Sequence, residues 1–379
     1  MPSYLSTEEL AGALALRDLT DPAAGVHAVQ QVVATIERAV ETAWHVPVRR
    51  EPGSRVVPVA DNYNRLRYDR HAVTRDRRYS RYVGPGRMLR SHTTAAIPGL
   101  LDRLAAEDGG PRDVVLSVPG ICYRRDAIDR THVGEPHQLD LWRVRRGGPP
   151  LTEADLTQLV GLVVGAVLPG RAWRTPPSPH PYTLAGREVY VAGGDHEVEV
   201  GECGLAHPAV LAGAGLPAGT TGLAMGLGVD RLTMLAKGIP DIRLLRATDP
   251  RIADQLRDLT PYRGVSMMPA TARDLSLAVS ADFDAELLGD RVRELLGSEA
   301  GAVEEVAVLA ETGYADLPAA ARRRLGARPG HKNVLLRVML RHLDRSLTAA
   351  EANALRDRIY AGLHEGTAYQ WASSATGAR

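Results

Sequence analysis

The stretch Gly222-Leu223-Ala224-Met225-Gly226-Leu227-Gly228-Val229-Asp230-Arg231-Leu232 carries the most information about the fold of this chain. Its closely spaced glycines let the backbone approach a flat ligand, because glycine has no side chain to hold the ligand away. Arg231 lies on the helix predicted to follow, from which it can reach a triphosphate. A glycine pair followed by an arginine is a weak indication of nucleotide binding by itself, so the rest of the sequence decides its meaning.

A second stretch places an arginine where a predicted buried strand ends. It reads CYRRDAIDRTH at 122–132 and continues to His137-Gln138. Arg124 can grip the α-phosphate of ATP, and Asp126, two residues further on, can hold its geometry. A surface ion pair is the alternative interpretation of this arginine and acid. His132 and His137 suit either a role in this loop or a structural hydrogen bond.

The order of predicted elements indicates an α+β protein with two parts. A capping box at Ser6 and Glu9 predicts a short helix, and a longer amphipathic helix follows over 26–44. Strands are predicted at 113–118, 138–144, 188–192 and 197–200, with a helix over 156–167. After a connector at 244–264, the order is strand 274–279, helix 285–296, strands 303–309 and 334–342, and helix 349–363, which fits a ferredoxin-like split βαβ module.

Length and composition bound the possibilities further. The chain has 379 residues and a formal net charge of +1, so no overall basic field indicates a nucleic-acid partner. Its two cysteines, Cys122 and Cys203, are far apart and predict neither a disulfide framework nor a cysteine zinc site. With no signal peptide and no apolar run of membrane-spanning length, we expect a cytoplasmic protein without a membrane partner, as a monomer or homodimer.

Five ordered segments resemble the class II aminoacyl-tRNA synthetases of the phenylalanyl type. The stretch at 122–138 is similar to motif 2 of that family, and GLGVDRLTMLAKGIPDIRLL at 226–245 is similar to motif 3. DNYNRL at 61–66 with LRSHTT at 89–94 resembles the entry to the active site, and EVEVGECGLAHPAVL at 197–211 the strand and turn that line it. PATARDLSLAV at 269–279 through DRSLTAAEANALRDRI at 344–359 resembles the C-terminal anticodon-binding domain. This layout is similar to the single-chain, organellar form of the enzyme.

The resemblance implies a fold and a reaction. The fold would be α+β, with a class II catalytic domain built on an antiparallel sheet of six or more strands and a ferredoxin-like anticodon-binding domain after it. We expect an N-terminal helical segment at 1–50, the catalytic domain at 51–262, the anticodon-binding domain at 263–366 and a polar tail at 367–379. The reaction would join an amino acid to ATP as an aminoacyl-adenylate and then transfer the acyl group to tRNA, with Mg²⁺ neutralising the phosphates.

The resemblance also implies roles for individual residues at the nucleotide. Arg124 would bind the α-phosphate, Asp126 would orient that site, and Arg231 would hold the γ-phosphate. Glu199 would lie near the nucleotide and its Mg²⁺. Two glycines would line the ATP site, Gly226 and Gly228.

At the amino acid, the resemblance implies contacts from His92, Thr93 and Gln138, and from Asp140 where the family usually has glutamate. Other positions depart from the family. Its Phe-Pro-Phe becomes His180-Pro181-Tyr182, its aromatic-Ala-Phe becomes Leu223-Ala224-Met225, and Glu202 replaces a glycine. We therefore expect a more polar amino-acid pocket. The alternative is that the polar residues point away while Met225 and Leu223 fill the space.

The C-terminal module contains a basic cluster, which predicts contact with tRNA: Arg322, Arg323, Arg324, Arg328 and Lys332. A solvated charged loop is the alternative interpretation of this cluster. Two other functions stay open for the whole chain. It could transfer the activated amino acid to a small molecule, or it could be a non-catalytic RNA-binding regulator.

Overall fold

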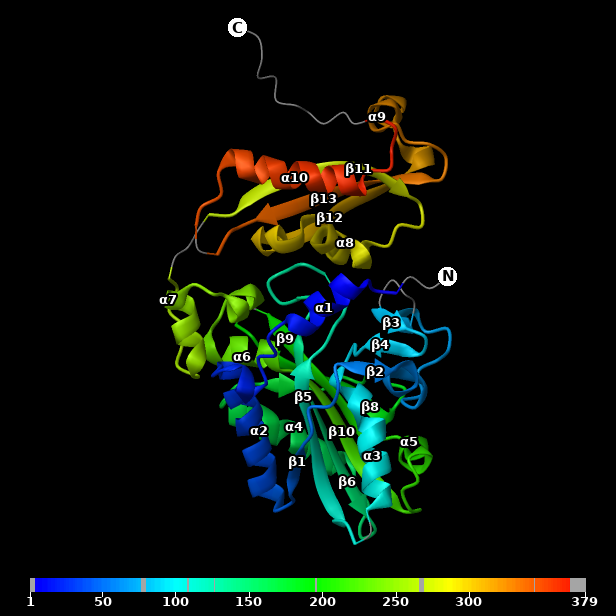
Figure 1. The fold of residues 1–379 in the computed structure, drawn as a ribbon, viewed down its shortest axis with the longest axis vertical. Helices are drawn as coiled ribbons and strands as arrows, with labels where there is room; N and C mark the ends of the chain where they lie inside the picture. Colours follow the sequence, from blue (N-terminus) through cyan, green and yellow to red (C-terminus); the bar gives the residue numbers. More distant parts are fainter. Residues whose placement is uncertain are drawn as a thin grey trace. The chain divides into compact units, whose positions relative to one another are not determined.

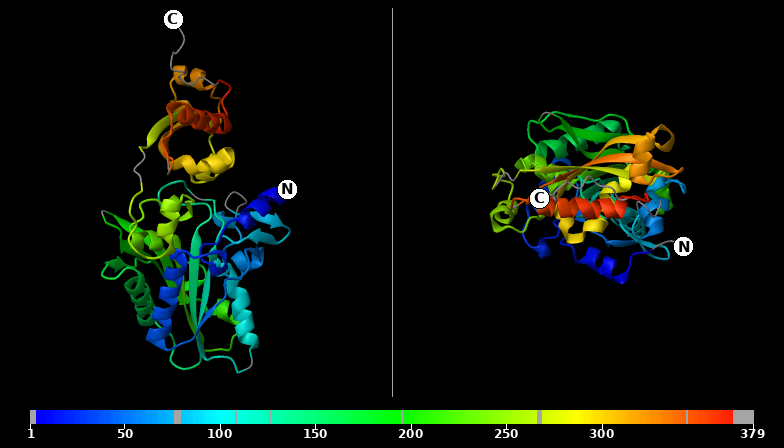
Figure 2. Two further views of the ribbon diagram at one scale, coloured as in Figure 1. Left: turned by 60° about the vertical axis from the view of Figure 1, so that its left-hand side comes forward. Right: turned by 90° about the horizontal axis from the view of Figure 1, so that it is seen from above.

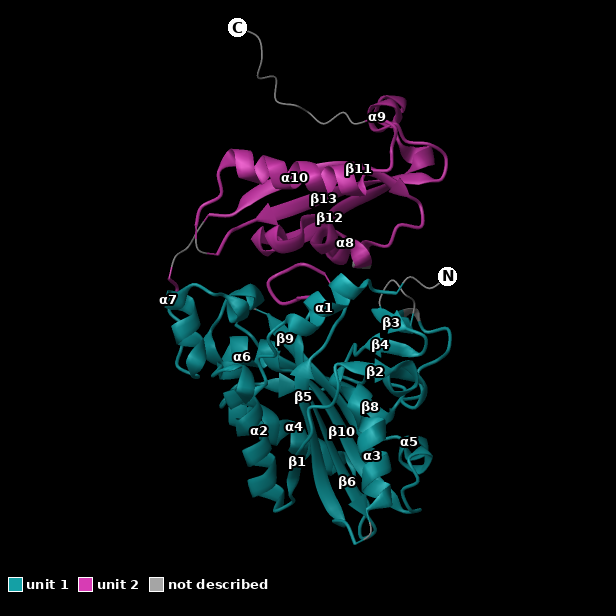
Figure 3. Cartoon of the chain, in the orientation of Figure 1, with its two compact units in different colours: residues 1–124, 135–263 teal, residues 125–134, 264–379 magenta. Residues whose placement is uncertain are grey.

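Two groups of residues pack as separate units in the computed structural model (Figures 1 and 3). Unit 1 comprises Met1–Arg124 and Glu135–Arg263, and unit 2 comprises Arg125–Gly134 and Gly264–Arg379. The structure describes residues 4–75, 80–107, 109–125, 127–194, 196–265, 269–343 and 345–368. The connection between two strands of unit 1 therefore belongs to unit 2, which the sequence did not indicate.

A seven-stranded sheet forms the centre of unit 1. Its strand order is β1-β5-β6-β10-β9-β8-β7, and every neighbouring pair is antiparallel except β1 with β5. The prediction of a large antiparallel sheet with helices is confirmed. The strands are β1 (Val48–Arg50), β5 (Asp113–Ile121), β6 (His137–Arg146), β7 (Trp173–Arg174), β8 (Thr183–Ala192), β9 (Glu197–Ala206) and β10 (Thr220–Gly228). A smaller sheet contains β2 (Val56–Pro58), β3 (Tyr82–Gly84) and β4 (Arg87–Leu89).

Helices cover both faces of the large sheet (Figures 1 and 2). On one face lie α2 (Ala28–Trp44), α4 (Glu153–Val167) and α6 (Val229–Lys237), and on the other α3 (Ile97–Ala106) and α5 (Pro208–Gly213). The remaining α-helices of unit 1 are α1 (Thr7–Ala15), which begins with the predicted capping box, and α7 (Pro250–Ala253). Short 3-10 or π turns occur at Pro22–Ala24, Ala60–Asn64, Val73–Arg75, Thr93–Ala96, Ile242–Arg246 and Asp254–Arg257.

The sequence pattern explains why α2 packs against the sheet. Val29, Val33, Ile36 and Val40 recur at helical spacing, and all four are buried. Val26 was expected on the same face, but it precedes the helix and is exposed. The side chain of His27 accepts the backbone N–H of Val29, so the helix begins only after it.

One glycine of β5 is required by a close approach. Gly120 has φ +154°, and a Cβ placed there would lie 1.8 Å from Nη2 of Arg90. The buried Arg90 guanidinium donates to the carbonyl of Ile121 at 2.8 Å and also to that of Pro52. A larger residue at position 120 would displace this arginine, which links β5 to the segment before α3.

Unit 2 contains a three-stranded sheet in the order β11-β13-β12. Its strands are β11 (Thr271–Ser280), β12 (Val303–Gly313) and β13 (His331–Leu340), and its α-helices are α8 (Leu288–Leu296), α9 (Ala319–Leu325) and α10 (Ala349–Leu363). 3-10 turns lie at Ala285–Leu287, Gly297–Ala302 and Tyr314–Asp316. Because β13 is antiparallel to both neighbours, β11 and β12 run parallel and are joined through α8. This is the predicted order of elements, with α9 in addition. The assignment as a ferredoxin-like anticodon-binding domain stays a prediction.

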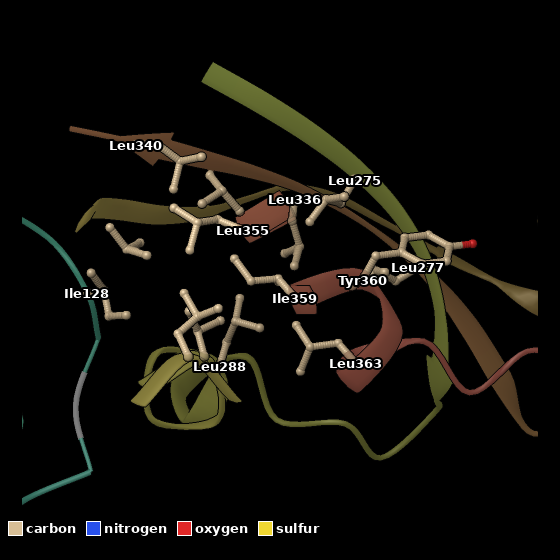
Figure 4. Close-up of a cluster of buried hydrophobic side chains, with 14 of the residues drawn as sticks. Ile128, Leu275, Leu277, Leu288, Leu336, Leu340, Leu355, Ile359, Tyr360 and Leu363 are labelled. Carbon is tan, nitrogen blue, oxygen red and sulfur yellow. The ribbon is translucent and has the colours of Figure 1, made fainter. Parts of the chain in front are cut away.

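The segment Arg125–Gly134 contributes to the core of unit 2 (Figure 4). Ile128 is 6% exposed among the buried side chains of α8, α10 and the sheet. The backbone N–H of Val306 donates to the carbonyl of Ile128 at 3.0 Å. Arg125 pairs with Asp290 at 2.7 Å. One apolar anchor and these polar contacts fasten the segment to unit 2.

Candidate active site

Three neighbouring strands, β6, β10 and β9, form the floor of the candidate site. Asp140 lies opposite Gly226, which in turn lies opposite Glu202. Directly opposed residues of antiparallel strands point to the same face of the sheet, so the two carboxylates flank Gly226. A Cβ at Gly226 would lie 3.7 Å from Oδ2 of Asp140 and 4.0 Å from Oε1 of Glu202. Because both oxygens lie within 4.0 Å of one point, they are at most about 8 Å apart.

The next row of opposed residues on the same face of the sheet is buried. Trp142 lies opposite Ala224, which lies opposite Gly204, and all three are buried. Tyr182 packs in the same apolar cluster as Trp142 and Ala224, with ring centroids 6.1 Å from those of Trp142. Gly226 and Gly228, in contrast, are partly exposed. The sheet is therefore accessible at the rows of these two glycines and filled beyond them.

Asp140 is held by three donors. The hydroxyls of Thr93 and Thr94 donate to its Oδ2 at 2.9 and 2.8 Å, and Nε1 of Trp142 donates to its Oδ1 at 3.1 Å. Burial raises the pKa of the Asp140 carboxyl to about 6. Gln138, on the same strand, accepts the backbone N–H of Thr93 at 3.3 Å. The structure thus brings three predicted residues together: Thr93, Gln138 and Asp140.

Glu202 is held by the two residues that replace aromatic hydrocarbon in the family pattern. The hydroxyl of Tyr182 donates to its Oε1, and Nε2 of His180 lies 2.7 Å from its Oε2. Burial opposes charge on both partners, but their mutual hydrogen bond raises the pKa of His180 and lowers that of Glu202. The Glu202 side chain is 38% exposed, so a ligand can still reach it.

His92 stacks on Tyr68, with ring centroids 5.8 Å apart and planes at 17°. Tyr68 in turn lies 6.3 Å from Tyr182. Within the part of the chain that the structure describes, neither ring nitrogen of His92 has a hydrogen-bond partner. Burial lowers the pKa of the His92 imidazole to about 4, so the ring is neutral near pH 7. A neutral imidazole with one donor and one acceptor available can bind a polar ligand.

The predicted phosphate ligands lie just beyond the row of Gly226, where β10 ends and β9 begins. Helix α6 begins at Val229 directly after β10, which puts Arg231 in its first turn. Nη1 of Arg231 donates to the Glu199 carbonyl at 2.9 Å and pairs with the Glu199 carboxylate. Arg124 follows β5, and its Nε donates to the carbonyl of Ser91 at 2.9 Å. Asp126 lies outside the described residues.

Glu199 suits the predicted magnesium contact. Mg²⁺ is commonly held by one or two carboxylates together with substrate phosphates, and the Glu199 side chain is 37% exposed beside Arg231. No cluster of three or more histidine, cysteine, aspartate or glutamate residues suited to a metal occurs in the described parts of the chain. The donor set therefore fits a metal held largely by the nucleotide.

None of the described helices is long and apolar enough to cross a membrane.

Leu223 and Met225 do not contribute to this face, contrary to the prediction. They alternate with Ala224 and Gly226 along β10, so their side chains point to the opposite side of the sheet. Met225 lies opposite Cys203 and Leu141 there, and all three are buried. The two residues fill core space under α2, α4 and α6.

The two histidines of motif 2 make structural hydrogen bonds. His137 is fully buried, with Nδ1 2.9 Å from Oδ1 of Asp230, while its Nε2 accepts the backbone N–H of Leu19 at 3.0 Å. This bridge joins the start of β6 to α6 and to the N-terminal segment. In unit 2, Nδ1 of His132 lies 2.6 Å from the carboxylate of Asp129.

Sequence reasoning missed three residues of the site: Tyr68, Thr94 and Trp142. Trp142 could have been found, because it follows Asp140 by two positions on a predicted strand and so shares its face. Thr94 is adjacent to the predicted Thr93. Tyr68 carried no signal, since it follows an irregular segment.

The predicted tRNA-contacting residues of unit 2 are only partly available. They lie on α9, on the loop after it and on β13, and not on one loop as the sequence suggested. Arg322 stacks on Tyr314 at 4.5 Å, and Lys332 pairs with Glu311 at 2.9 Å. Three others are exposed: Arg323, Arg324 and Arg328.

Comparison with known proteins gives a consistent picture. The family model described as "tRNA synthetases class II core domain (F)" matches residues 18–256. A phenylalanine–tRNA ligase alpha subunit of Prochlorococcus marinus is 32% identical over 63% of this chain and 69% of that protein. A probable mitochondrial phenylalanine–tRNA ligase of Drosophila melanogaster is 27% identical over 80% of this chain and 74% of that protein. The match to a structure of a pyrrolysyl tRNA synthetase from Desulfitobacterium hafniense covers 58% of this chain and 73% of that one, with a TM-score of 0.45 and 16% identity.

Proposed function

This chain belongs to the class II tRNA synthetases of the phenylalanyl type, and on that premise we propose that it activates an amino acid with ATP and transfers it to tRNA. Its side-chain pocket would be more polar than the family's. The predicted family resemblance is confirmed, and its relatives are ligases. We further propose a cytoplasmic location.

One observation carries the proposal: the row Asp140–Gly226–Glu202 adjoins the junction of β10 and α6, and Arg231 lies in the first turn of α6. An amino acid above Gly226 could place its ammonium group near Asp140, an attraction between opposite charges. Its carboxylate could then meet the α-phosphate of an ATP held by Arg124 and Arg231. Positioning these two groups supplies much of the rate acceleration in adenylate formation.

The chain's own residues provide electrostatic stabilisation. Arg124 would neutralise charge that develops on the α-phosphate as the amino-acid carboxylate attacks it and pyrophosphate leaves. Arg231 would leave its ion pair with Glu199 to bind the γ-phosphate, which frees the Glu199 carboxylate. Bound Mg²⁺ would neutralise the phosphates, with Glu199 as its protein contact.

The polar pocket is supported by the contacts of Glu202. Its carboxylate, His180 and the hydroxyl of Tyr182 form one hydrogen-bonded group on the floor of the site. Phenylalanine offers this group no hydrogen bond. Desolvating such a group without compensation costs about 1–3 kcal/mol per polar atom, so we propose that phenylalanine is not the preferred substrate.

Transfer to tRNA is supported by unit 2. The alignment with the mitochondrial relative spans 80% of this chain, more than residues 1–263 can supply, so it extends into unit 2. We propose that unit 2 is a ferredoxin-like anticodon-binding domain, with Arg323, Arg324 and Arg328 as exposed phosphate contacts.

Pyrophosphate exchange followed by tRNA charging tests the proposal. A panel of proteinogenic and non-proteinogenic amino acids is screened for ATP–pyrophosphate exchange, and the best is tested for transfer to total tRNA. We expect exchange with at least one amino acid and a base-labile ester on tRNA. Exchange without charging would refute transfer to tRNA and favour a small-molecule acceptor. The absence of exchange with every amino acid would refute activation itself.

A further inference from the structure

The space for a substrate side chain is short. Beyond Gly226, the floor of the site is closed by Trp142 and by Tyr182, which are 0% and 3% exposed. The ring centroids of Tyr68 and Tyr182 are 6.3 Å apart at a plane angle of 34°, within the roughly 4.5–7 Å of a packed aromatic pair, so the two rings leave no room for a third between them. A side chain that enters at the row of Gly226 therefore meets these rings after a few bonds.

Next to Gly226, this space is faced by two carboxylate acceptors, from Asp140 and Glu202. Oδ2 of Asp140 and Oε1 of Glu202 both lie within 4.0 Å of the point where a Cβ of Gly226 would be. Among the residues that the structure describes, Oδ2 accepts two threonine hydroxyls, whereas Oε1 accepts one donor, the Tyr182 hydroxyl. A carboxylate oxygen can accept two hydrogen bonds, so Glu202 keeps an acceptor position for a ligand.

We infer that the site takes a compact amino acid whose side chain carries a hydrogen-bond donor, a hydroxyl or an amine, and that Glu202 is the residue that selects it. The inference rests on the proposed function of amino-acid activation. The substrate lies over Gly226, with its α-ammonium group toward Asp140 and its side-chain donor toward Glu202. Oδ2 of Asp140 and Oε1 of Glu202 are at most about 8 Å apart. An amino acid that contacts both oxygens therefore has its side-chain donor only two or three bonds from Cα.

His180 and Tyr182 act as positioning residues for Glu202. Each holds one carboxylate oxygen, which fixes the rotamer of Glu202 and the direction of its remaining acceptor position. A fixed carboxylate discriminates more strongly than a mobile one, because its geometry need not be ordered on binding. A neutral hydroxyl and a cationic amine could both donate to this position, so the experiment separates them.

Matched amino-acid pairs test the inference in the pyrophosphate exchange assay. Threonine is compared with valine and serine with alanine, since each pair is similar in size and differs in the hydroxyl. 2,3-Diaminopropionate and 2,4-diaminobutyrate test the amine, and phenylalanine and tyrosine test size. We expect the donor-bearing member to exceed its partner about 10- to 100-fold in kcat/KM, as for a hydrogen bond to a charged group.

Substitution of Glu202 tests its role as the selecting residue. In Glu202→Gln the length is kept and the charge removed, so the preference for the donor-bearing member should fall at least about tenfold. The fall should come from the donor-bearing substrate, while kcat/KM for its partner changes little. Glu197→Gln is the matched control, because Glu197 lies on the same strand and pairs with the surface residue Arg174. This control should keep the wild-type preference.

The outcomes separate the inference from the proposed function. If phenylalanine or valine gives the best exchange, or if Glu202→Gln keeps the preference, the inference is wrong while activation stands. If no amino acid supports exchange, the proposed function fails. Calorimetric titration of the same panel then decides the inference: tighter binding of threonine than valine supports it, and equal or undetectable binding overturns it.

Discussion

Asp140 offers a test that links the stability of the protein to the protonation of one carboxyl in the site. Its carboxyl is 2% exposed, and burial raises its pKa from an ordinary value of 3.8 to about 6. The folded protein therefore holds this proton more tightly than the unfolded chain does. The resulting stability is fully present below about pH 4 and is lost as the pH rises through 6.

The size of the effect follows from the shift. Two pKa units correspond to about 3 kcal/mol, of which about 2 kcal/mol is lost between about pH 4.5 and pH 8. Asp140→Asn cannot titrate. Its amide can still accept from the threonines, but an NH₂ group then faces Nε1 of Trp142, donor against donor, which costs about 1–3 kcal/mol. That cost does not depend on pH, so it cancels when the two pH values are compared.

Urea unfolding followed by tryptophan fluorescence measures this difference, because three of the four tryptophans of the chain lie in unit 1: Trp44, Trp142 and Trp173. Relative to Asp140→Asn, the wild type should lose about 2 kcal/mol between the two pH values, while the variant loses pyrophosphate exchange. Asp113→Asn is the control. Arg143 and Arg145 hold the pKa of Asp113 below its ordinary value despite burial, so it stays ionised throughout this range. If the free energies of unfolding of the wild type and Asp140→Asn differ by the same amount at both pH values, the reasoning is refuted.

Three further predictions concern other parts of the chain. Leu223→Ala should lower the free energy of unfolding by about 2–5 kcal/mol and leave the ranking of amino acids in exchange unchanged; a changed ranking would contradict its placement on the far face. His137→Ala should destabilise unit 1 by about 1.5–3 kcal/mol, because it removes the imidazole partner of the buried Asp230 and leaves only the backbone N–H of residue 137 on that carboxylate, and unchanged urea unfolding would argue against this bridge. Replacing Arg323 and Arg324 together by alanine should weaken tRNA binding and reduce its salt dependence, with a slope smaller by about one per lost contact; an unchanged slope in a filter-binding titration would exclude them as phosphate contacts.

Much of the fold follows from the sequence by periodicity. The apolar spacing of α2 and the helix over Glu153–Val167 were evident, and the predicted strands of both units correspond to observed strands. Each of these elements buries one continuous face or stripe, so the spacing of its apolar residues shows which side packs against the rest of the protein. The boundaries were less exact, because strand ends such as Pro119–Ile121 are set by pairing with distant residues.

The place of residues 125–134 could not be predicted in this way. The segment is polar, with Ile128 as its large apolar residue, and that side chain packs against strands and helices more than one hundred positions away. Its hydrogen bond from Val306 joins two parts of the sequence with no local relation. A short segment held by distant partners leaves no periodic trace in its own sequence.

Family resemblance identified residues of the site, but the alternation of side chains along a strand decides which of them share one face. Asp140 and Glu202 were identified residue by residue, and the pairing through Gly226 explains why they share one face. Leu223 and Met225 were misplaced because the alternation along β10 was not applied to the glycine-rich stretch. The contacts among His180, Tyr182 and Glu202 depend on how β8 and β9 align, which no single segment encodes.

The most direct test of amino-acid activation is ATP–pyrophosphate exchange with the best substrate, compared between wild type, Arg124→Ala and Arg87→Ala. Arg124 follows β5, and its Nε donates to the carbonyl of Ser91, whereas Arg87 is exposed on β4 and serves as the matched arginine control. Arg124→Ala should lose at least about 100-fold in exchange activity, because it removes a contact to charge that develops in the transition state. Its unfolding curve should be unchanged. Arg87→Ala should keep wild-type activity. Full exchange activity in Arg124→Ala, or no exchange by the wild type with any amino acid, would contradict the account.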